Sequence, residues 1–285
     1  MVLIIGATGF IGMYTTQAFL KAGKQVIATG RNKILGRKLE EMGAEFLTLD
    51  ITNKDEFDKL PTEGVEGVIL LAGLLPANAA VNLDVDVIGT INVLEYCRRN
   101  GIRKVIGNCS YSDVSGAWGK KYPITEDEPR NFKFMGDHAI YVISRNAAND
   151  VMEYYNQQHG MQCAWFRFPP VYGVGPHGTI YVNGTPKKSG IATFIDNARE
   201  GKAIEIWGDP HIKRDIIYVK DVADAYVAAL KSNLTCGLYN MTGHVQIDLD
   251  EQVKAVVNVF GGEKKSPLIY RPEKSNSTPS FLYSM

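Results

Sequence analysis

The first twelve residues constrain the fold more than any other segment of the chain. They contain the run V-L-I-I-G-A-T-G-F-I-G from Val2 to Gly12, with glycines at positions 6, 9 and 12. The run at 2–5 has the composition of a buried strand, and Phe10 and Ile11 begin the apolar stripe of a helix. Glycine permits φ > 0 at the turn, and a helix N-terminus attracts anions. This order predicts a site for a dinucleotide diphosphate, with a plain glycine-rich turn as the alternative.

The composition excludes several functional classes. A chain of 285 residues can bury a large core in one elaborated domain or two subdomains. The 31 Lys and Arg balance the 31 Asp and Glu, so no overall field favours nucleic acid or an anionic membrane. The four cysteines form no C-x-x-C pair, so we expect neither a disulfide framework nor a metal site. No long apolar segment or basic leader is evident, which predicts a cytoplasmic protein without a membrane span.

Strand and helix patterns alternate over about the first 170 residues. Strand-like runs lie at 25–29, 45–49, 67–71, 103–109 and 161–168, and helical periodicity lies at 11–22, 33–42, 83–100 and 138–159. The alternation predicts an α/β fold with a doubly wound, Rossmann-like parallel sheet covered on both faces. Within these strand-like runs, Cys109 and Cys163 are expected to be small buried hydrophobes.

The last third of the chain has a different composition. Glycine and proline become frequent from Pro169 onward, a composition that resists regular structure. We expect helices at 190–200, 219–231 and 249–260, a strand at 203–207, and an irregular or frayed tail at 271–285. The predicted division is a cofactor-binding domain at 1–168 with about 212–240, and a small substrate-binding subdomain at 169–211 and 241–285.

The turn after the second strand predicts which nicotinamide cofactor is preferred. An acid about 20 residues past the glycines binds the ribose of NAD, whereas an Arg accommodates the 2′-phosphate of NADP. The chain reads I-A-T-G-R-N here, so Arg31 favours NADP over NAD; a plain surface arginine is the alternative. Asp50, after the third strand, is placed to meet the adenine, although a helix N-cap would look the same. Ala72 and Gly73 would let the backbone lie close to the cofactor.

Five motifs follow one another along nearly the whole chain. They are G-A-T-G-F-I-G at 6–12, G-T-I-N-V-L-E at 89–95, P-I-T-E-D-E-P at 123–129, V-Y-G-V-G-P at 171–176 and R-D-I-I-Y-V-K-D-V-A-D-A at 214–225. With them the chain resembles the extended short-chain dehydrogenase/reductases, the NAD(P)-dependent epimerase/dehydratase family. The resemblance implies a nicotinamide cofactor, a small-molecule substrate, and a homodimer built on the helices near 83–100 and 138–159.

The resemblance also implies the catalytic residues. The family uses a Tyr, a Lys four residues later on the same helix face, and a Ser or Thr after the fifth strand. The Lys holds the nicotinamide ribose and lowers the Tyr pKa, so that the phenol exchanges a proton at neutral pH. The pair here is Tyr141 and Arg145. Arginine keeps the charge but presents a planar fork, so the exchange is not conservative.

The hydroxyl residue has three candidates. Counting from the fifth strand gives Ser110, which would polarise the reacting oxygen. Counting back from Gly116 gives Tyr111 instead, because this loop carries one extra residue, and Ser112 is the third candidate. A strand-end turn residue is an equally good interpretation of Ser110.

Three positions bear on the substrate. Sugar-nucleotide enzymes of the family carry Asn at two positions where this chain has Pro170 and Asp86. Pro170 removes a hydrogen-bond donor, and Asp86 adds a negative charge. Arg214 matches the diphosphate-binding Arg of the family, with a surface pair to Asp215 as the alternative. Dehydratases carry an Asp-Glu pair after the hydroxyl residue, and only Asp113 is near, so dehydration is the least favoured reaction.

Two functional hypotheses follow. In the first, an NADP-dependent enzyme transfers hydride between nicotinamide and a carbonyl or secondary alcohol, with catalytic Tyr141, Arg145 and Ser110 and with Ser112, Arg214 and Asp86 at the substrate. In the second, the chain is a non-catalytic NADP(H)-binding protein that reports redox state to a partner. The residues expected to bind the cofactor are Gly6, Thr8, Gly9, Phe10, Ile11, Gly12, Arg31, Asp50, Ile51, Leu71, Ala72, Gly73, Tyr141, Arg145, Phe168, Pro169 and Val171.

Overall fold

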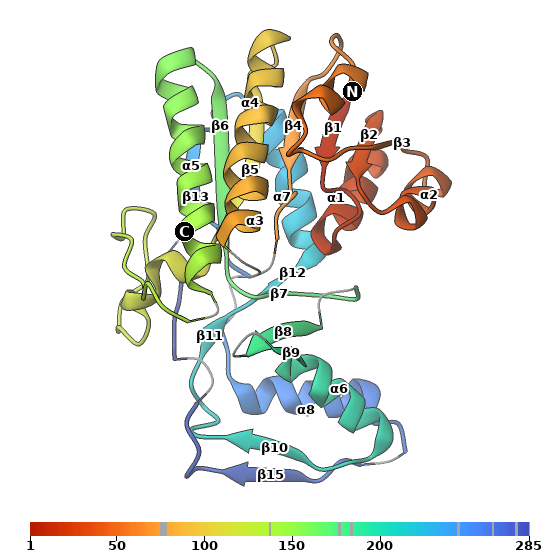
Figure 1. The fold of residues 1–285 in the computed structure, drawn as a ribbon. Coiled ribbons are helices and arrows are strands. Elements are labelled where there is room, and N and C mark those ends of the chain that lie inside the picture. Colours follow the sequence, from red (N-terminus) through yellow and green to blue (C-terminus); the bar gives the residue numbers. More distant parts are fainter. Residues whose placement is uncertain are drawn as a thin grey trace.

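The central sheet is parallel throughout and has seven strands (Figure 1). The computed structural model describes residues 1–74, 79–136, 138–175, 178–182, 185–243, 246–263, 265–276 and 279–284. The sheet strands are β1 (Val2–Ile5), β2 (Val26–Gly30), β3 (Glu45–Thr48), β4 (Gly67–Leu70), β5 (Lys104–Ser110), β6 (Gln162–Phe168) and β13 (Gly237–Asn240). Their order, β13-β6-β5-β4-β1-β2-β3, confirms the doubly wound Rossmann-like prediction.

Helices cover both faces of the sheet, as the crossovers of a parallel sheet require. One face carries α1 (Phe10–Lys21), α2 (Lys33–Glu41) and α7 (Val219–Lys231). The other carries α3 (Ala79–Leu83), the π-helix η2 (Asp84–Ile88), α4 (Gly89–Arg99) and α5 (Ala139–His159). The single helix predicted at 83–100 is therefore a longer run with a π-helical segment inside it. Among the described residues, none of the helices combines the length and the hydropathy that a membrane crossing requires.

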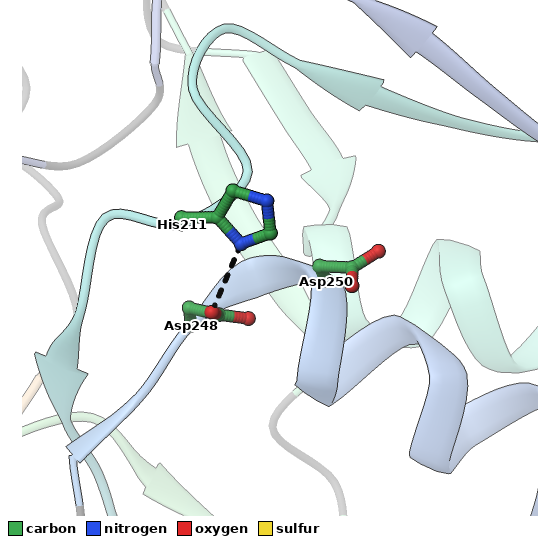
Figure 2. Close-up of side chains that lie close together, drawn as sticks. All are labelled: His211, Asp248 and Asp250. Carbon is green, nitrogen blue, oxygen red and sulfur yellow. Dashed lines mark hydrogen bonds and ion pairs between the residues drawn. The ribbon is translucent and has the colours of Figure 1, made fainter.

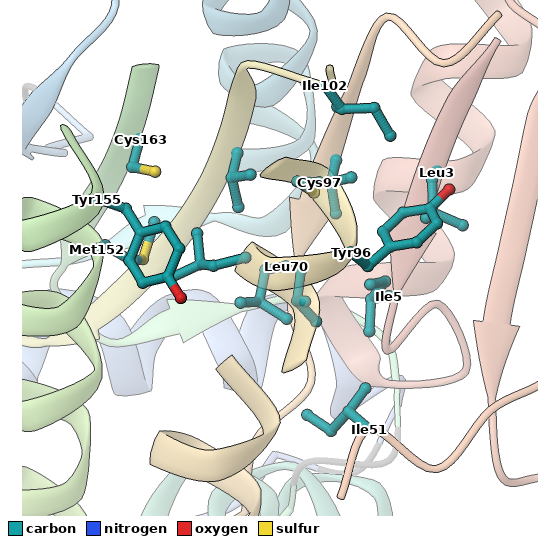
Figure 3. Close-up of a cluster of buried hydrophobic side chains, with 14 of the residues drawn as sticks. Leu3, Ile5, Ile51, Leu70, Tyr96, Cys97, Ile102, Met152, Tyr155 and Cys163 are labelled. Carbon is teal, nitrogen blue, oxygen red and sulfur yellow. The ribbon is translucent and has the colours of Figure 1, made fainter. Parts of the chain in front are cut away.

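Strand alternation divides the core into two clusters. Leu3 and Ile5 of β1 join the cluster under α4 and α5, while Val2 and Ile4 join the cluster under α1, α2 and α7. Figure 3 shows the first cluster, with side chains from β1, β4, α4 and α5, and with Cys163 among them. Cys109 belongs to the same cluster, so both cysteines are buried as predicted.

A smaller region lies beyond the carboxyl ends of the sheet strands (Figure 1). It contains β8 (Thr179–Val182), β9 (Thr185–Lys188), α6 (Gly190–Glu200), β10 (Ile204–Trp207), α8 (Leu249–Phe260) and β15 (Leu268–Arg271). Of these elements, α6, β10, α8 and β15 share a buried cluster, which includes Ile204, Ile206 and Val253. Short pairs connect the two regions: β7 (Val171–Tyr172) with β12 (Ile217–Tyr218), and β11 (Arg214–Asp215) with β14 (Gln246–Ile247). Pro176 and Gly184 lie outside the described residues.

The predicted frayed tail is wrong for its last described residues. Phe281 and Tyr283 are almost fully buried, against the short helix η3 (Tyr111–Ala117) and the loop that follows it. The Ile124 N–H donates to the Leu282 carbonyl at 2.7 Å, and β11 pairs with Phe281. The two alternating aromatic rings provide apolar surface that the surrounding Ser and Pro residues obscure in the sequence.

Candidate active site

The glycine turn fixes the relative position of β1, α1 and the loop after β4. Gly6 has φ of 87°, and a Cβ on it would overlap the backbone of Ala72. A Cβ on Gly12 would overlap the Gly6 carbonyl, so α1 can pack this closely only with glycine there. Gly9 is the N-cap of α1 and supplies no side-chain hydrogen bond. The sequence predicts that an anionic ligand approaches the N-terminus of α1, and Gly9 places no side chain in its way.

A pocket opens at the carboxyl ends of β1, β2 and β4. Its lining consists of Ile5, Gly6, Thr8, Gly9, Gly30, Arg31, Leu49, Asp50, Ile51, Leu71, Ala72, Gly73 and Val85. Most of these were predicted from sequence as cofactor contacts. Four lining residues were not predicted from the sequence: Ile5, Gly30, Leu49 and Val85. The first three directly precede the predicted residues Gly6, Arg31 and Asp50 at the ends of strands.

The remaining predicted cofactor residues surround this pocket without lining it. Phe10, Ile11 and Gly12 form the first turn of α1. Phe168 ends β6 in register with Ser110 of β5, and Pro169 and Val171 follow it. Phe168 thus lies at the carboxyl edge of the sheet beside Ser110, and Phe10 lies against Gly173 and Gly175.

Arg31 and Asp50 mark the end of the pocket farthest from α5. Arg31 is exposed. Burial acts to raise the pKa of Asp50, but hydrogen bonds from Thr52 and the charge of Arg31 outweigh it, so the net pKa is lowered. Asp50 is therefore ionised at neutral pH. The alternative role of Asp50 as a helix N-cap does not hold, because Asn53 caps the helix that follows, η1 (Lys54–Lys59).

Tyr141 and Arg145 lie one turn apart on α5, as the four-residue spacing predicts. The guanidinium carbon of Arg145 is 5.7 Å from the centre of the Tyr141 ring. Burial raises the pKa of Tyr141, and the Arg145 charge lowers it by less, so the net pKa lies above its usual value. The phenol is thus protonated at neutral pH, which is opposite to the direction that the family pattern predicts for this pair.

Asp86, which the family pattern predicts at the substrate, contacts α5 through both carboxylate oxygens. Its Oδ2 accepts a hydrogen bond from Ser144 Oγ at 2.6 Å, and its Oδ1 lies 3.5 Å from Arg145 Nη2. The side chain of Asp86 is fully buried, and that of Arg145 is 9% exposed. A Cβ on Gly73 would overlap the Arg145 guanidinium, so the arginine fills the space that glycine leaves. Ser144 was missed from sequence because the family pattern assigns no role to this position.

Two of the three hydroxyl candidates, Ser110 and Tyr111, have side chains in different surroundings. Ser110 is buried at the end of β5, and its Oγ accepts the Ser112 N–H at 3.1 Å as the N-cap of η3. The Tyr111 ring packs against Trp118 and Phe281. Ser110 is thus a turn residue at the end of a strand, which is one of the two interpretations that the sequence allows. A hydroxyl that accepts this bond still has its own proton to donate to a reacting oxygen.

Asp113 belongs to the core of the molecule. Arg167 Nη2 donates to Asp113 Oδ2 at 2.8 Å, and Arg167 Nη1 donates to Asn240 Oδ1 at 3.1 Å. Both charged side chains are almost fully buried. This pair attaches η3 to β6 and β13. Asp113 is therefore occupied by a structural ion pair, which further disfavours a dehydratase role.

Replacing Asp113 with Ala should lower the stability of the protein. Loss of the carboxylate leaves the buried Arg167 charge without compensation, and we expect the free energy of unfolding to fall by about 3–5 kcal/mol. Chemical denaturation measures this change. The exposed Asp127→Ala variant is the matched control, and an Asp113→Ala protein as stable as this control would contradict the structural role.

Arg214 points away from its sequence neighbour. Asp215 is fully buried, and its carboxylate accepts the Gly243 N–H at 3.2 Å. Successive side chains of a strand point in opposite directions, so the surface pair of Arg214 with Asp215 is not formed. Burial lowers the pKa of Arg214, and the nearby Tyr111 acts in the opposite direction. Arg214 and Tyr141 both lie close enough to Tyr111 to affect its pKa, Arg214 by lowering it and Tyr141 by raising it.

A second group of polar side chains lies outside this cleft. Figure 2 shows His211, Asp248 and Asp250 near the N-terminus of α8. Asp248 accepts the Glu251 N–H as part of a capping box. Asp250 accepts Tyr270 Oη at 2.6 Å and Lys254 Nζ at 2.6 Å. Because the carboxylates already hold these donors and an ammonium lies among them, the group is a helix-capping cluster rather than a cation site.

Comparisons with known proteins agree with this architecture. A UDP-glucose 4-epimerase of Thermotoga maritima, solved with UDP-glucose, has a TM-score of 0.79 at 21% identity, covering 99% of this chain and 89% of that one. The Thermus thermophilus UDP-glucose 4-epimerase, solved with NAD, has a TM-score of 0.75 at 22% identity, covering 99% of this chain and 90% of that one. These two structures share the fold of the chain.

Sequence comparison places the chain in a family. A candidate UDP-glucose 4-epimerase of Methanocaldococcus jannaschii is 31% identical over 242 residues, which cover 81% of this chain and 73% of the relative. The profile of the NAD dependent epimerase/dehydratase family matches residues 2–241. The chain therefore belongs to the NAD-dependent epimerase/dehydratase family, the extended short-chain dehydrogenase/reductases.

Proposed function

We propose that this protein is an NADP-dependent enzyme that transfers hydride between nicotinamide and a carbonyl or secondary alcohol of a sugar nucleotide. The observation that carries the proposal is a pocket at the carboxyl edge of the sheet that extends from Arg31 across the glycine turn to Gly73, against which the Arg145 guanidinium of α5 packs. Names of relatives support the substrate class, since they include UDP-glucose 4-epimerases.

The described residues fit a nicotinamide dinucleotide. The close approach at Gly6 and Gly12 and the uncapped α1 suit a diphosphate, because backbone N–H groups and the helix dipole favour anions. Asp50 and Arg31 would flank the adenosine, with Arg31 on the 2′-phosphate. When bound, the cofactor supplies a carbon that accepts or donates hydride.

The residues at the other end of the site would handle the proton. Tyr141 would exchange it with the substrate oxygen, and Ser110 would orient that oxygen by a hydrogen bond. Arg145 would hold the ribose and favour the ionised phenol, because a positive charge stabilises a phenolate. Whether the net change is reduction or epimerisation depends on how the substrate is held after the first transfer.

The substrate itself would be held by the smaller region. The elements β8, β9, α6, β10, α8 and β15 lie beyond the carboxyl ends of the sheet strands. Arg214, the counterpart of the family's diphosphate-binding arginine, is close enough to Tyr111 to lower its pKa. Ser112 would contribute a polar contact. Asp86, being buried under Arg145, would not belong to this group.

Replacing Arg31 with Ser should reduce the preference for NADPH over NADH. The guanidinium would no longer pair with the 2′-phosphate, and we expect the affinity ratio to fall by about tenfold, or about 1.4 kcal/mol. Nucleotide fluorescence titrations measure both affinities. Arg37→Ser, which removes an exposed arginine of α2, is the matched control, and an unchanged ratio in Arg31→Ser would count against the NADP assignment.

Turnover of sugar nucleotides tests the catalytic part of the proposal. The protein is incubated with NADP⁺ and a panel of UDP-, dTDP- and GDP-hexoses, and reduced nicotinamide and sugar isomers are followed by absorbance and proton NMR. We expect one of the sugars to be converted. Tight NADPH binding without conversion of any sugar would favour the non-catalytic redox-sensing alternative.

A further inference from the structure

Asp86 and Arg145 are the only buried ion pair of the described residues that borders the cofactor pocket. Asp86 comes from η2, the π-helical segment between α3 and α4, and Arg145 comes from α5, which packs against η2. The guanidinium extends past Asp86 to the space above Gly73, which lines the pocket. Asp86 therefore has direct access to the residue that the proposed function places on the ribose.

The pair is only partly made. Asp86 Oδ1 and Arg145 Nε are buried and have no hydrogen-bond partner, although Asp86 Oδ1 is 3.5 Å from Arg145 Nη2. Ser144 holds the other carboxylate oxygen, so Asp86 is fixed to α5 on one side. The carboxylate thus holds the arginine by charge while leaving the planar fork turned toward Gly73 and Tyr141.

Several groups face Tyr141. From α5 and its N-cap these are Arg145 and His138, whose ring centre is 6.4 Å from that of Tyr141. From the neighbouring elements they are Asp86 of η2, Cys109 of β5, Tyr111 of η3 and, through Arg145, Tyr226 of α7. The Arg145 charge lowers the pKa of Tyr141, and the Asp86 charge raises it.

We propose that Asp86 is a positioning residue for Arg145: its buried carboxylate holds the guanidinium between Gly73 and Tyr141, and the two residues function as one unit. The inference rests on the proposed function for the role of Tyr141. It explains why both departures from the family pattern occur together, Asp for Asn at 86 and Arg for Lys at 145. A forked arginine spans from Asp86 to Gly73, whereas a lysine ammonium is a point charge that would settle on the carboxylate.

The experiment is a double-mutant cycle on Asp86→Asn and Arg145→Lys. Arg145→Lys alone should lower turnover by about a hundredfold, because the ammonium is drawn to Asp86 and leaves the ribose and phenol. Adding Asp86→Asn removes that attraction and should restore most of the lost turnover. The pKa of Tyr141 should rise in Arg145→Lys and fall by roughly one unit in Asp86→Asn.

The tyrosine readout does not require a substrate. Tyrosinate absorbance is titrated for each variant against the same variant carrying Tyr141→Phe, which isolates one of the 14 tyrosines. NADPH affinity is measured on the same samples. The matched controls are Asp84→Asn, an exposed carboxylate of the same π-helix, and Arg99→Lys, an exposed arginine of α4, and neither should move the Tyr141 titration.

Three results would overturn the inference. The first is that Arg145→Lys turns over substrate as fast as wild type or faster. The second is that the double variant has no higher turnover than Arg145→Lys alone. The third is that the pKa of Tyr141 is the same in Asp86→Asn as in wild type. If Asp86→Asn does not fold, Ser144→Ala replaces it: the released carboxylate should close on Arg145 and raise the pKa of Tyr141, and an unchanged titration overturns the inference. Absence of NADPH binding and turnover in wild type would instead reject the proposed function, and the titrations would still be interpretable.

Discussion

Gly9→Val should abolish most of the NADPH affinity while leaving the fold intact. Gly9 is the N-cap of α1 with extended backbone angles that any residue adopts, and a Cβ there meets only the Gly6 carbonyl, at 3.3 Å. A valine would therefore project its methyl groups into the pocket that Gly9 lines. We expect affinity to fall by roughly 100-fold, about 2.8 kcal/mol, in a fluorescence titration.

The control is another glycine at a helix start. Gly190 begins α6 after a serine N-cap, and a Cβ there has no neighbour within 4 Å. Gly190→Val should bind NADPH like wild type, and both variants should melt near the wild-type temperature. Wild-type affinity in a folded Gly9→Val protein would mean that the diphosphate does not approach the N-terminus of α1.

Tyr141→Phe should have the largest effect on turnover. Removing the hydroxyl removes the proposed proton donor and acceptor, and general acid–base catalysis contributes roughly 10²–10⁴-fold to a rate. Turnover is measured with the sugar nucleotide that gives the highest wild-type rate. The NADPH affinity should stay close to wild type, because the ring and Arg145 remain.

The pH dependence distinguishes this role from a packing role. Burial raises the pKa of Tyr141, so the phenol is protonated at neutral pH and oxidation of an alcohol should speed up as pH rises. Tyr141→Phe should lose this dependence. Tyr154→Phe, which alters a half-exposed ring on the same helix, should retain both rate and pH profile. A Tyr141→Phe protein with wild-type turnover would show that another group handles the proton.

Much of the fold follows from local patterns in the sequence. The helices at 190–200, 219–231 and 249–260 have the predicted bounds. Each has a clear apolar stripe, and the first and third also have a capping side chain at the N-terminus and a glycine at the C-terminus. The alternation of strands and helices predicts a parallel sheet and leaves few possible strand orders. The π-helical turn at η2 could not be foreseen, because it depends on packing against α5 rather than on residue preference.

The site was predictable where backbone geometry dominates. The glycine turn and the strand ends place Gly6, Arg31 and Ala72 around one pocket, as their positions in βα turns require. Asp86 was expected at the substrate because a family position suggested it. Its partners within the protein, Arg145 and Ser144, are fixed by the docking of η2 on α5, which involves residues about 60 positions apart and is not visible in a local pattern.

Long-range packing also explains the tail. Phe281 and Tyr283 are buried against η3, and no local pattern predicts a partner so distant in sequence. The pKa of Tyr141 likewise could not be predicted from the sequence. Its direction depends on how burial compares with the charges of Arg145 and Asp86, and this comparison requires the three-dimensional structure.

A fluorescence titration of the wild-type protein with NADPH and with NADH, in one buffer, tests the central claim most directly. We predict that NADPH binds at least about tenfold more tightly, a difference of about 1.4 kcal/mol, because Arg31 meets the 2′-phosphate. Equal or tighter binding of NADH would contradict the NADP assignment. Failure of both nucleotides to bind would contradict the cofactor site itself.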